Sequence, residues 1–259
     1  MNAIWTTWIL LSLASAIPLN DQTILHSTSV EKAGWYDPRV NGGRLLDVRS
    51  LLSWYLFGQF ILAQFTAGTQ GEPLNIIISS NSDPYILTDS GFVGYAKSIG
   101  YSHECLGLHY GHKHEANLGD GDGQKPELVL ARQHYFPVWG TCWESLAGGQ
   151  HFRAWKQNGS LADSGAWFVG RNHMIVPNGY NLGRDWFVKR ALKGTNWNGR
   201  WWKAQVEWRT DLLEKGNKGQ LTLPHILNSL ILITSLAPTD VNHGIAQDGR
   251  VAVMTVIRQ

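Results

Sequence analysis

The order of apolar and polar residues along the chain predicts strands that alternate with helices. Residues 74–79 (LNIIIS) form a short apolar, β-branched run, which is typical of a buried strand. Within 89–100 the apolar residues recur at helical spacing, and Gly100 follows them as a helix stop. A strand followed by a helix favours an α/β or α+β arrangement of layers.

Further strands are predicted in the middle and at the end of the chain. Residues 127–135 indicate one strand, and 150–155 (QHFRAW) with 165–170 (GAWFVG) indicate a strand pair around a turn. Apolar and polar residues alternate through 201–208, which predicts a half-buried strand. Residues 250–257 are apolar on both faces, as expected of a central strand.

A second helix is expected within residues 178–192. Asn181 is its predicted N-cap, and Asp185 then lies in the first turn, where the helix dipole favours an acid. Residues 34–47 are rich in turn formers and predict an extended lead-in. Together these elements predict a single layered domain of the α/β (α+β) class, with a mixed sheet and a few helices.

The ends of the chain suggest how it is organised. Residues 1–16 hold a short apolar run that ends in Ala-Ser-Ala, so we expect a cleaved signal peptide and a secreted, extracellular protein. A lead-in over 17–71 precedes the α/β domain at 72–259. Apolar inserts at 48–64 and 219–239 are too short or too polar for a stable membrane span. They are either core helices or translated, unspliced introns, since the codons of Val48 and Gln64 allow intron ends.

Composition narrows the class of protein. The net charge is only +2, which argues against a nucleic-acid partner. The 13 tryptophans indicate either an aromatic core or a surface that faces carbohydrate or lipid. In an oxidising compartment Cys105 and Cys142 predict one disulfide, with two buried thiols as the alternative. Asn158 begins an N-glycosylation sequon in a turn-like context.

Three stretches resemble a known family. They are EPLNIIIS…GFVGYAKSIGY, HFRAW…GAWFVG and HMIVPNGYNLGRDWFV. They look like fungal secreted proteins of uncharacterised function, which in turn resemble the LssY carboxy-terminal domain of bacteria. The resemblance covers most of 72–210 and the stretch VNHGIAQDGRVAVMTV near the end. It implies secretion and an α/β fold but no established reaction, and the segment between Gly170 and His173 looks shortened here.

The resemblance singles out one set of polar residues. If 150–155 is a strand, His151, Arg153 and Trp155 share one face, opposite Phe152 and Ala154. The remaining motif positions are His173, Arg184 and Asp185. Arginines donate bidentate hydrogen bonds to phosphate or carboxylate, so the set is a candidate anion site. The alternative is a buried structural network, and nearby Arg171 is expected to be a solvated charge.

Two other clusters are weaker candidates for metal binding. HYGHKHE places His109, His112 and His114 next to Glu115, all of them ligand types for zinc; an exposed loop is the alternative. In NLGDGDGQKPE, Asp120 and Asp122 alternate with glycines as in calcium loops; a glycine-rich turn is the alternative. Apart from this candidate calcium site, no cofactor is expected.

Three functions remain open from the sequence. The first is a ligand-binding or interaction module with an anion site and an unknown extracellular ligand. The second is a phosphoester hydrolase that uses His151 or His173 as acid and base. The third is a glycan-binding surface protein, for which Trp197 is the best candidate for an exposed ring, whereas Trp202 is expected in the core. No nucleophile elbow, P-loop or zinc-protease motif favours an enzyme.

Overall fold

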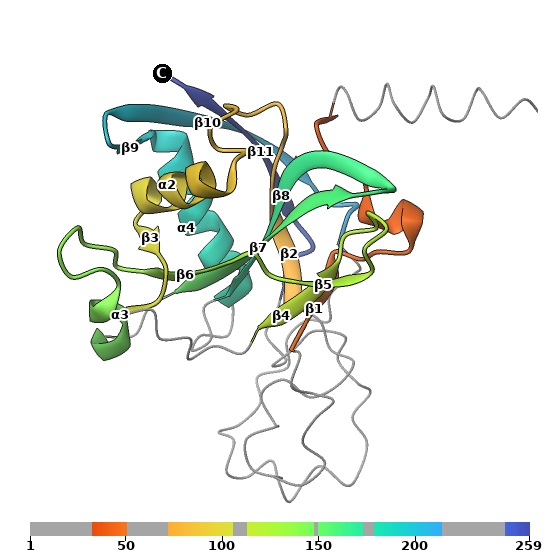
Figure 1. Ribbon diagram of the computed structural model, residues 1–259, viewed down its shortest axis with the longest axis horizontal. Coiled ribbons are helices and arrows are strands. Elements are labelled where there is room, and N and C mark those ends of the chain that lie inside the picture. Colours follow the sequence, from red (N-terminus) through yellow and green to blue (C-terminus); the bar gives the residue numbers. More distant parts are fainter. Residues whose placement is uncertain (1–32, 51–71, 106–112, 148–149, 173–178, 214–246) are drawn as a thin grey trace, which may run out of the picture.

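A curled, mixed β-sheet runs through the computed structural model, which describes residues 33–50, 72–105, 113–147, 150–172, 179–213 and 247–259 (Figure 1). The strands are β1 (Leu46–Ser50), β2 (Glu72–Ile78), β3 (Tyr101–Ser102), β4 (His114–Asn117), β5 (Gln124–Pro126), β6 (Val129–Gln133), β7 (His151–Gly159), β8 (Ala162–Asn172), β9 (Thr195–Trp197), β10 (Arg200–Arg209) and β11 (Val251–Arg258). The helices are the 3-10 helix η1 (Pro38–Asn41) and the α-helices α2 (Asp89–Ile99), α3 (Cys142–Ala147) and α4 (Gly179–Lys193).

Strand β2 is the junction of this sheet. The order β3-β6-β7-β8-β2-β1-β4-β5 is antiparallel throughout. Strand β11 joins β2 in parallel and pairs with β10, which also pairs with β9. Strands and helices thus form one layered α+β domain, and the predicted fold class is confirmed.

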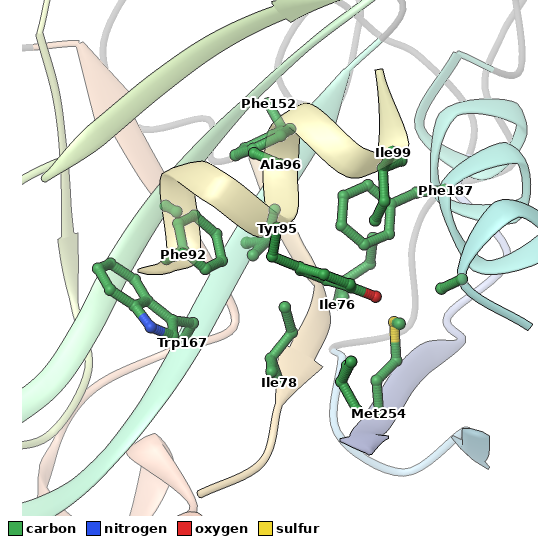
Figure 2. Packing of buried hydrophobic residues seen from close by; sticks show 14 of the residues in the cluster. Ile76, Ile78, Phe92, Tyr95, Ala96, Ile99, Phe152, Trp167, Phe187 and Met254 are labelled. Carbon is green, nitrogen blue, oxygen red and sulfur yellow. The ribbon is translucent and has the colours of Figure 1, made fainter. Parts of the chain in front are cut away.

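One face of the sheet is covered by α2 and α4. The side chain of Thr88 caps α2 by accepting from the Gly91 amide at 3.1 Å, and Gly100 ends the helix at a φ of 108°, as predicted. Figure 2 shows the buried face of α2, with Phe92 and Tyr95, lying over Ile76 and Ile78 of β2. Helix α4 adds Phe187 to the same core. The hydrophobic effect on this face therefore ties both helices to the sheet centre.

The opposite face is also buried. Here β1 and β4 curl over the sheet, so that Leu46, Ala116 and Leu118 pack against Trp155 and Phe168. Strands β7, β8 and β2 therefore have apolar neighbours on both sides, which is the usual situation of central strands in a layered fold.

The hairpin of β7 and β8 is longer than the sequence predicted. Pairing continues to Asn158↔Asp163 and Gly159↔Ala162, which leaves a turn of only two residues in place of the expected longer one. Gly159 is required there, because a Cβ atom would lie 2.2 Å from the carbonyl oxygen of Asp120.

The predicted pattern of the last two strands is confirmed. In β10, Trp202 and Ala204 are buried while Lys203, Gln205 and Glu207 are exposed. Strand β11 is buried on both faces over most of its length and lies between β10 and β2.

Several sequence predictions lie outside the described residues. These are the signal peptide at 1–16, the apolar insert at 219–239, and all of the insert at 48–64 except residues 48–50, which belong to β1. Within the described ranges, no helix combines the length and the apolar character that crossing a membrane requires.

A disulfide joins Cys105, just after β3, to Cys142 at the start of α3, as predicted. The two Cα atoms are 4.7 Å apart. The bond ties the segment that follows β6 back to the edge of the sheet.

Replacing Cys105 and Cys142 together with serine should lower the free energy of unfolding by about 3–4 kcal/mol. The crosslink spans 37 residues and restricts the unfolded chain across that distance. Urea unfolding of the oxidised protein and the double variant measures the difference. An unchanged midpoint and slope would contradict it.

Candidate functional site

The polar face of β7 lies inside the protein. His151 and Arg153 are buried on the face they share with Trp155, and Phe152 belongs to the helix-side core, so the predicted alternation is confirmed. Arg153 Nη1 donates to Glu127 Oε1 at 2.5 Å, and both side chains are about 95% buried. The polar face formed by His151, Arg153 and Trp155 therefore contains an internal ion pair.

His114 belongs to the same buried network. Its backbone amide donates to Glu127 Oε2 at 2.9 Å, and its Nδ1 lies 4.0 Å from Glu72 Oε2. Burial raises the pKa of Glu127 against the opposing charge of Arg153. Burial and the nearby Glu72 likewise raise the pKa of Tyr180. The geometry fits the alternative that the sequence left open, a structural network between the sheet and the curled β4.

Arg184 and Asp185 belong to a different network. Arg184 Nη1 and Nη2 grip the two oxygens of Asp248 at 2.6 and 2.7 Å, and Nε donates to Asp185 at 2.9 Å. Nη1 also donates to the carbonyl of Arg250 at 2.7 Å, and the guanidinium lies 5.0 Å from the ring of Trp208. This arginine is buried with its donors engaged, and it clamps α4 to the start of β11.

The predicted start of α4 was wrong by three residues, because an N-cap at Asn181 places the first helical residue at 182. The helix begins at Gly179, so Asn181 lies inside it and Asp185 lies beyond the first turn. Asn181 instead accepts from the backbone amide of Asp248 at 3.2 Å, because α4 docks on the segment before β11. The Asn181 side chain, which local rules assign to a helix cap, therefore bonds to a residue 67 positions away along the chain.

The candidate anion set is thus divided between two networks in the described part of the chain. Arg153 contacts Glu127, and Arg184 contacts Asp185 and Asp248. His173 lies outside the described residues.

The prediction that Arg171 is a solvated charge is wrong. Arg171 is 1% exposed and lies on the helix-facing side of β8. Its Nη2 donates to the Tyr101 hydroxyl and to Gln150 Oε1. The guanidinium carbon lies 4.8 Å from the ring of Tyr101, 5.2 Å from Trp186 and 5.7 Å from Phe187. The cation is therefore enclosed by three aromatic rings.

No carboxylate of the described residues pairs with Arg171, and its Nε and Nη1 have no hydrogen-bond acceptor there. Burial lowers the pKa of this guanidinium well below its ordinary value. Helix α4 passes directly over it: a Cβ atom at Gly183 would lie 3.2 Å from its Nε. A buried cation without a counter-ion costs several kcal/mol, although aromatic faces offset part of it.

A sequence signal for Arg171 existed. The apolar run GAWFVG leads directly into it, and strand alternation places it on the face of Trp167 and Val169. Those two residues are core residues, so Arg171 follows them inward. The predicted strand over 165–170 stops before Arg171, whereas β8 continues to Asn172.

The candidate metal sites receive no support. Asp120 is fully buried, and its carboxylate accepts from the ammonium of Lys125, which also lies 3.6 Å from Asp122. The three glycines between residues 119 and 123 have positive φ angles, which fits the glycine-rich turn. His109 and His112 lie outside the described residues. Within the described ranges no three metal-binding side chains gather.

The remaining candidates are surface features. Asn158 is exposed near the end of β7, and its Oδ1 accepts from Lys125 Nζ at 3.0 Å. Trp202 is a core residue, as predicted. Trp197 is half-buried against the core and makes an edge-to-face contact with Tyr135, so the prediction of an exposed ring was wrong. The exposed tryptophans of the described residues are Trp139, Trp143 and Trp201. Of these, the sequence offered Trp201 as part of a possible glycan platform and did not point to Trp139 or Trp143.

Replacing Glu127 with glutamine should destabilise the protein by about 3 kcal/mol, because it leaves the charge of Arg153 buried without its partner. The double variant Arg153→Met/Glu127→Leu should recover much of that loss. Chemical denaturation measures both, with Asp211→Asn in the half-exposed pair with Arg209 as the matched control, expected to cost under about 1 kcal/mol. Equal losses in Glu127→Gln and in the control would contradict the buried network.

The Arg184–Asp248 clamp should make stability depend on pH. Burial alone would raise the pKa of Asp248, but Arg184 and Arg250 hold it below its ordinary value of 3.8. The folded protein thus favours the ionised form, and the stabilisation is present above this value and lost as the pH falls further.

Asp248→Asn should therefore cost about 1.5–3 kcal/mol at neutral pH and much less in strong acid. Thermal unfolding of the wild type and variant across this pH range tests it, with exposed Asp163→Asn as the control. A loss that stays constant with pH would exclude the ion pair as its cause.

Comparison of the chain with protein-family models, with curated proteins and with solved structures found no match.

Proposed function

We propose that this protein is a binding module for a small oxyanion, such as a phosphate or carboxylate group, and that Arg171 is its anchoring residue. One observation carries the proposal: Arg171 is buried with two nitrogens that lack an acceptor among the described residues. The two arginines of the predicted anion set, Arg153 and Arg184, already hold carboxylates. An anion at Arg171 would supply the missing acceptors and balance the charge.

The surroundings of Arg171 suit an anion. Tyr101 contributes a hydroxyl, and Gln150 is held in place because its backbone oxygen accepts from the Gln133 amide at 2.8 Å. Segments 148–149 and 173–178, which adjoin Gln150 and β8 in sequence, contain no aspartate or glutamate, nor do 51–71 and 106–112. These four stretches carry no acid to neutralise this cation, whereas 1–32 and 214–246, which also lie outside the described residues, hold Asp21, Glu31, Glu214 and Asp240.

Binding is favoured over turnover at this site. A hydrolase needs an acid or base within reach of the bound group. His151, the described histidine proposed for that role, lies on the opposite face of β7 from the face that Arg171 shares. The groups that contact Arg171 are a phenol, an amide and aromatic rings, and none of them is a general acid or base suited to turnover near neutral pH.

Inorganic phosphate should raise the melting temperature of the wild type and leave Arg171→Met unchanged. Saturation at a hundredfold excess over Kd stabilises by about 2.7 kcal/mol, which shifts the melting temperature of a chain of this size by several degrees. Arg190→Met is the matched control, because Arg190 is exposed on α4 and also lies over Trp186, at 5.3 Å. It should keep the phosphate response.

The variant also tests the proposal without ligand. In phosphate-free buffer Arg171→Met removes a buried unpaired charge and should fold with unchanged or higher stability. A wild type that phosphate, sulfate and inositol phosphates all fail to stabilise would overturn the proposal. The partner of Arg171 would then be a carboxylate of the chain itself, and Arg171→Met would be strongly destabilised.

A further inference from the structure

The loop between β6 and α3 presents large apolar side chains to solvent. Val138 is 89% exposed and Trp139 73%, while Phe136 on the same loop and Trp143 on α3 are about half exposed. Figure 1 shows this loop projecting from the left edge of the molecule. We propose that these four residues, the apolar tip, dock the protein onto an anionic lipid surface. This inference concerns a surface separate from the site at Arg171.

The tip is built on a braced base. Phe136 and Gly140 exchange two backbone hydrogen bonds of 2.8 Å, which close a tight hairpin. The disulfide to Cys105 holds the start of α3, and the Thr141 hydroxyl donates to the carbonyl of His103 at 2.8 Å. Tryptophan and valine are therefore held outward by the surrounding structure, although both would be more stable away from water.

Two cations flank the base of the tip. Lys97 Nζ lies 5.5 Å from the ring of Tyr135, the residue before Phe136, and 5.4 Å from Trp197. Arg190 lies over Trp186, whose ring packs on Tyr101 at 5.6 Å. Neither Lys97 nor Arg190 has an ion pair with a described residue.

The nearby acids do not cancel these charges. Glu104 and Glu144 lie 2.6 and 3.7 Å from the guanidinium of Arg132, which neutralises part of their charge. The flank of the tip that carries Lys97 and Arg190 is therefore positive. Phosphate groups of an anionic bilayer complement that charge, and each nearby basic residue strengthens binding by about fivefold.

The shape and chemistry of the tip favour lipid over a sugar. Tryptophan partitions to the boundary between lipid headgroups and acyl chains, and shallow burial of apolar side chains is how peripheral proteins attach. A sugar ring is bound by a flat aromatic face next to polar groups. The most exposed residue of the tip is Val138, which offers neither.

The test is flotation of the full oxidised chain with mixed phosphatidylcholine–phosphatidylserine vesicles. Val138→Asp should weaken binding by at least about tenfold, because it places a charge where an apolar side chain enters the bilayer. Leu161→Asp is the matched control: Leu161 is 63% exposed on the β7–β8 turn and should not affect binding. Circular dichroism confirms that both variants fold.

Charge is tested in the same assay. Lys97→Gln/Arg190→Gln, higher salt and pure phosphatidylcholine vesicles should each weaken binding, whereas Arg171→Met should bind vesicles like the wild type. Loss of vesicle binding in Arg171→Met alone would assign the lipid contact to the anion site and overturn the proposal. Equal vesicle binding by Val138→Asp and Leu161→Asp would also overturn the proposal, as would the absence of vesicle binding by the wild type. An oligosaccharide that protects the tip, when vesicles do not bind, would overturn it in favour of a sugar.

Discussion

Strands β7, β8 and β2 are covered by α2 and α4 on one face and by the curled β1 and β4 on the other. Where both layers cover these strands, as at Arg153 and Arg171, a charged side chain has no face that leads to water. Each one must meet an opposite charge or a hydrogen-bond partner inside the protein, because burial of an isolated charge is costly. This double burial governs both the stability of the fold and the chemistry available to it.

The three buried arginines of the described residues meet that constraint in different ways. Arg153 pairs with Glu127 and ties β7 to the segment before β6, while Arg184 pairs with Asp248 and ties α4 to β11. Both join elements that are distant in sequence, as structural ion pairs do. Arg171 joins nothing acidic in the described chain, although it lies at the heart of the layer between β8 and α4. That difference separates a structural charge from a candidate ligand-binding one.

The outer surface shows the opposite feature, apolar side chains exposed to water. The interior contains buried charged side chains, whereas the loop after β6 exposes large apolar side chains to solvent. The disulfide lies at the base of that loop, so one covalent bond serves both the fold and the presentation of Val138 and Trp139. A positive base below an apolar tip and a buried cation below α4 would give the molecule two separate sites of contact with anions.

The sequence by itself determined the local elements and their faces. The runs that became β2, α2, β7, β10 and β11 were predicted because apolar spacing and turn residues act over a few positions. It also favoured a disulfide between Cys105 and Cys142, which the structure contains. It overestimated the turn after β7, because the pairing that shortens it depends on the partner strand.

Only the tertiary structure decided which charges meet. Glu127 lies 26 residues from Arg153, and Asp248 lies 64 residues from Arg184, so no local pattern links them. Asn181 does not cap the helix, because its side chain accepts a hydrogen bond from the backbone of Asp248, which is also distant in sequence. The burial of Arg171 depends on the packing of α4 over β8. This packing excludes water from the guanidinium, and α4 places no carboxylate next to it. Local periodicity assigns a side chain to a face, but the packing of distant elements decides what covers that face.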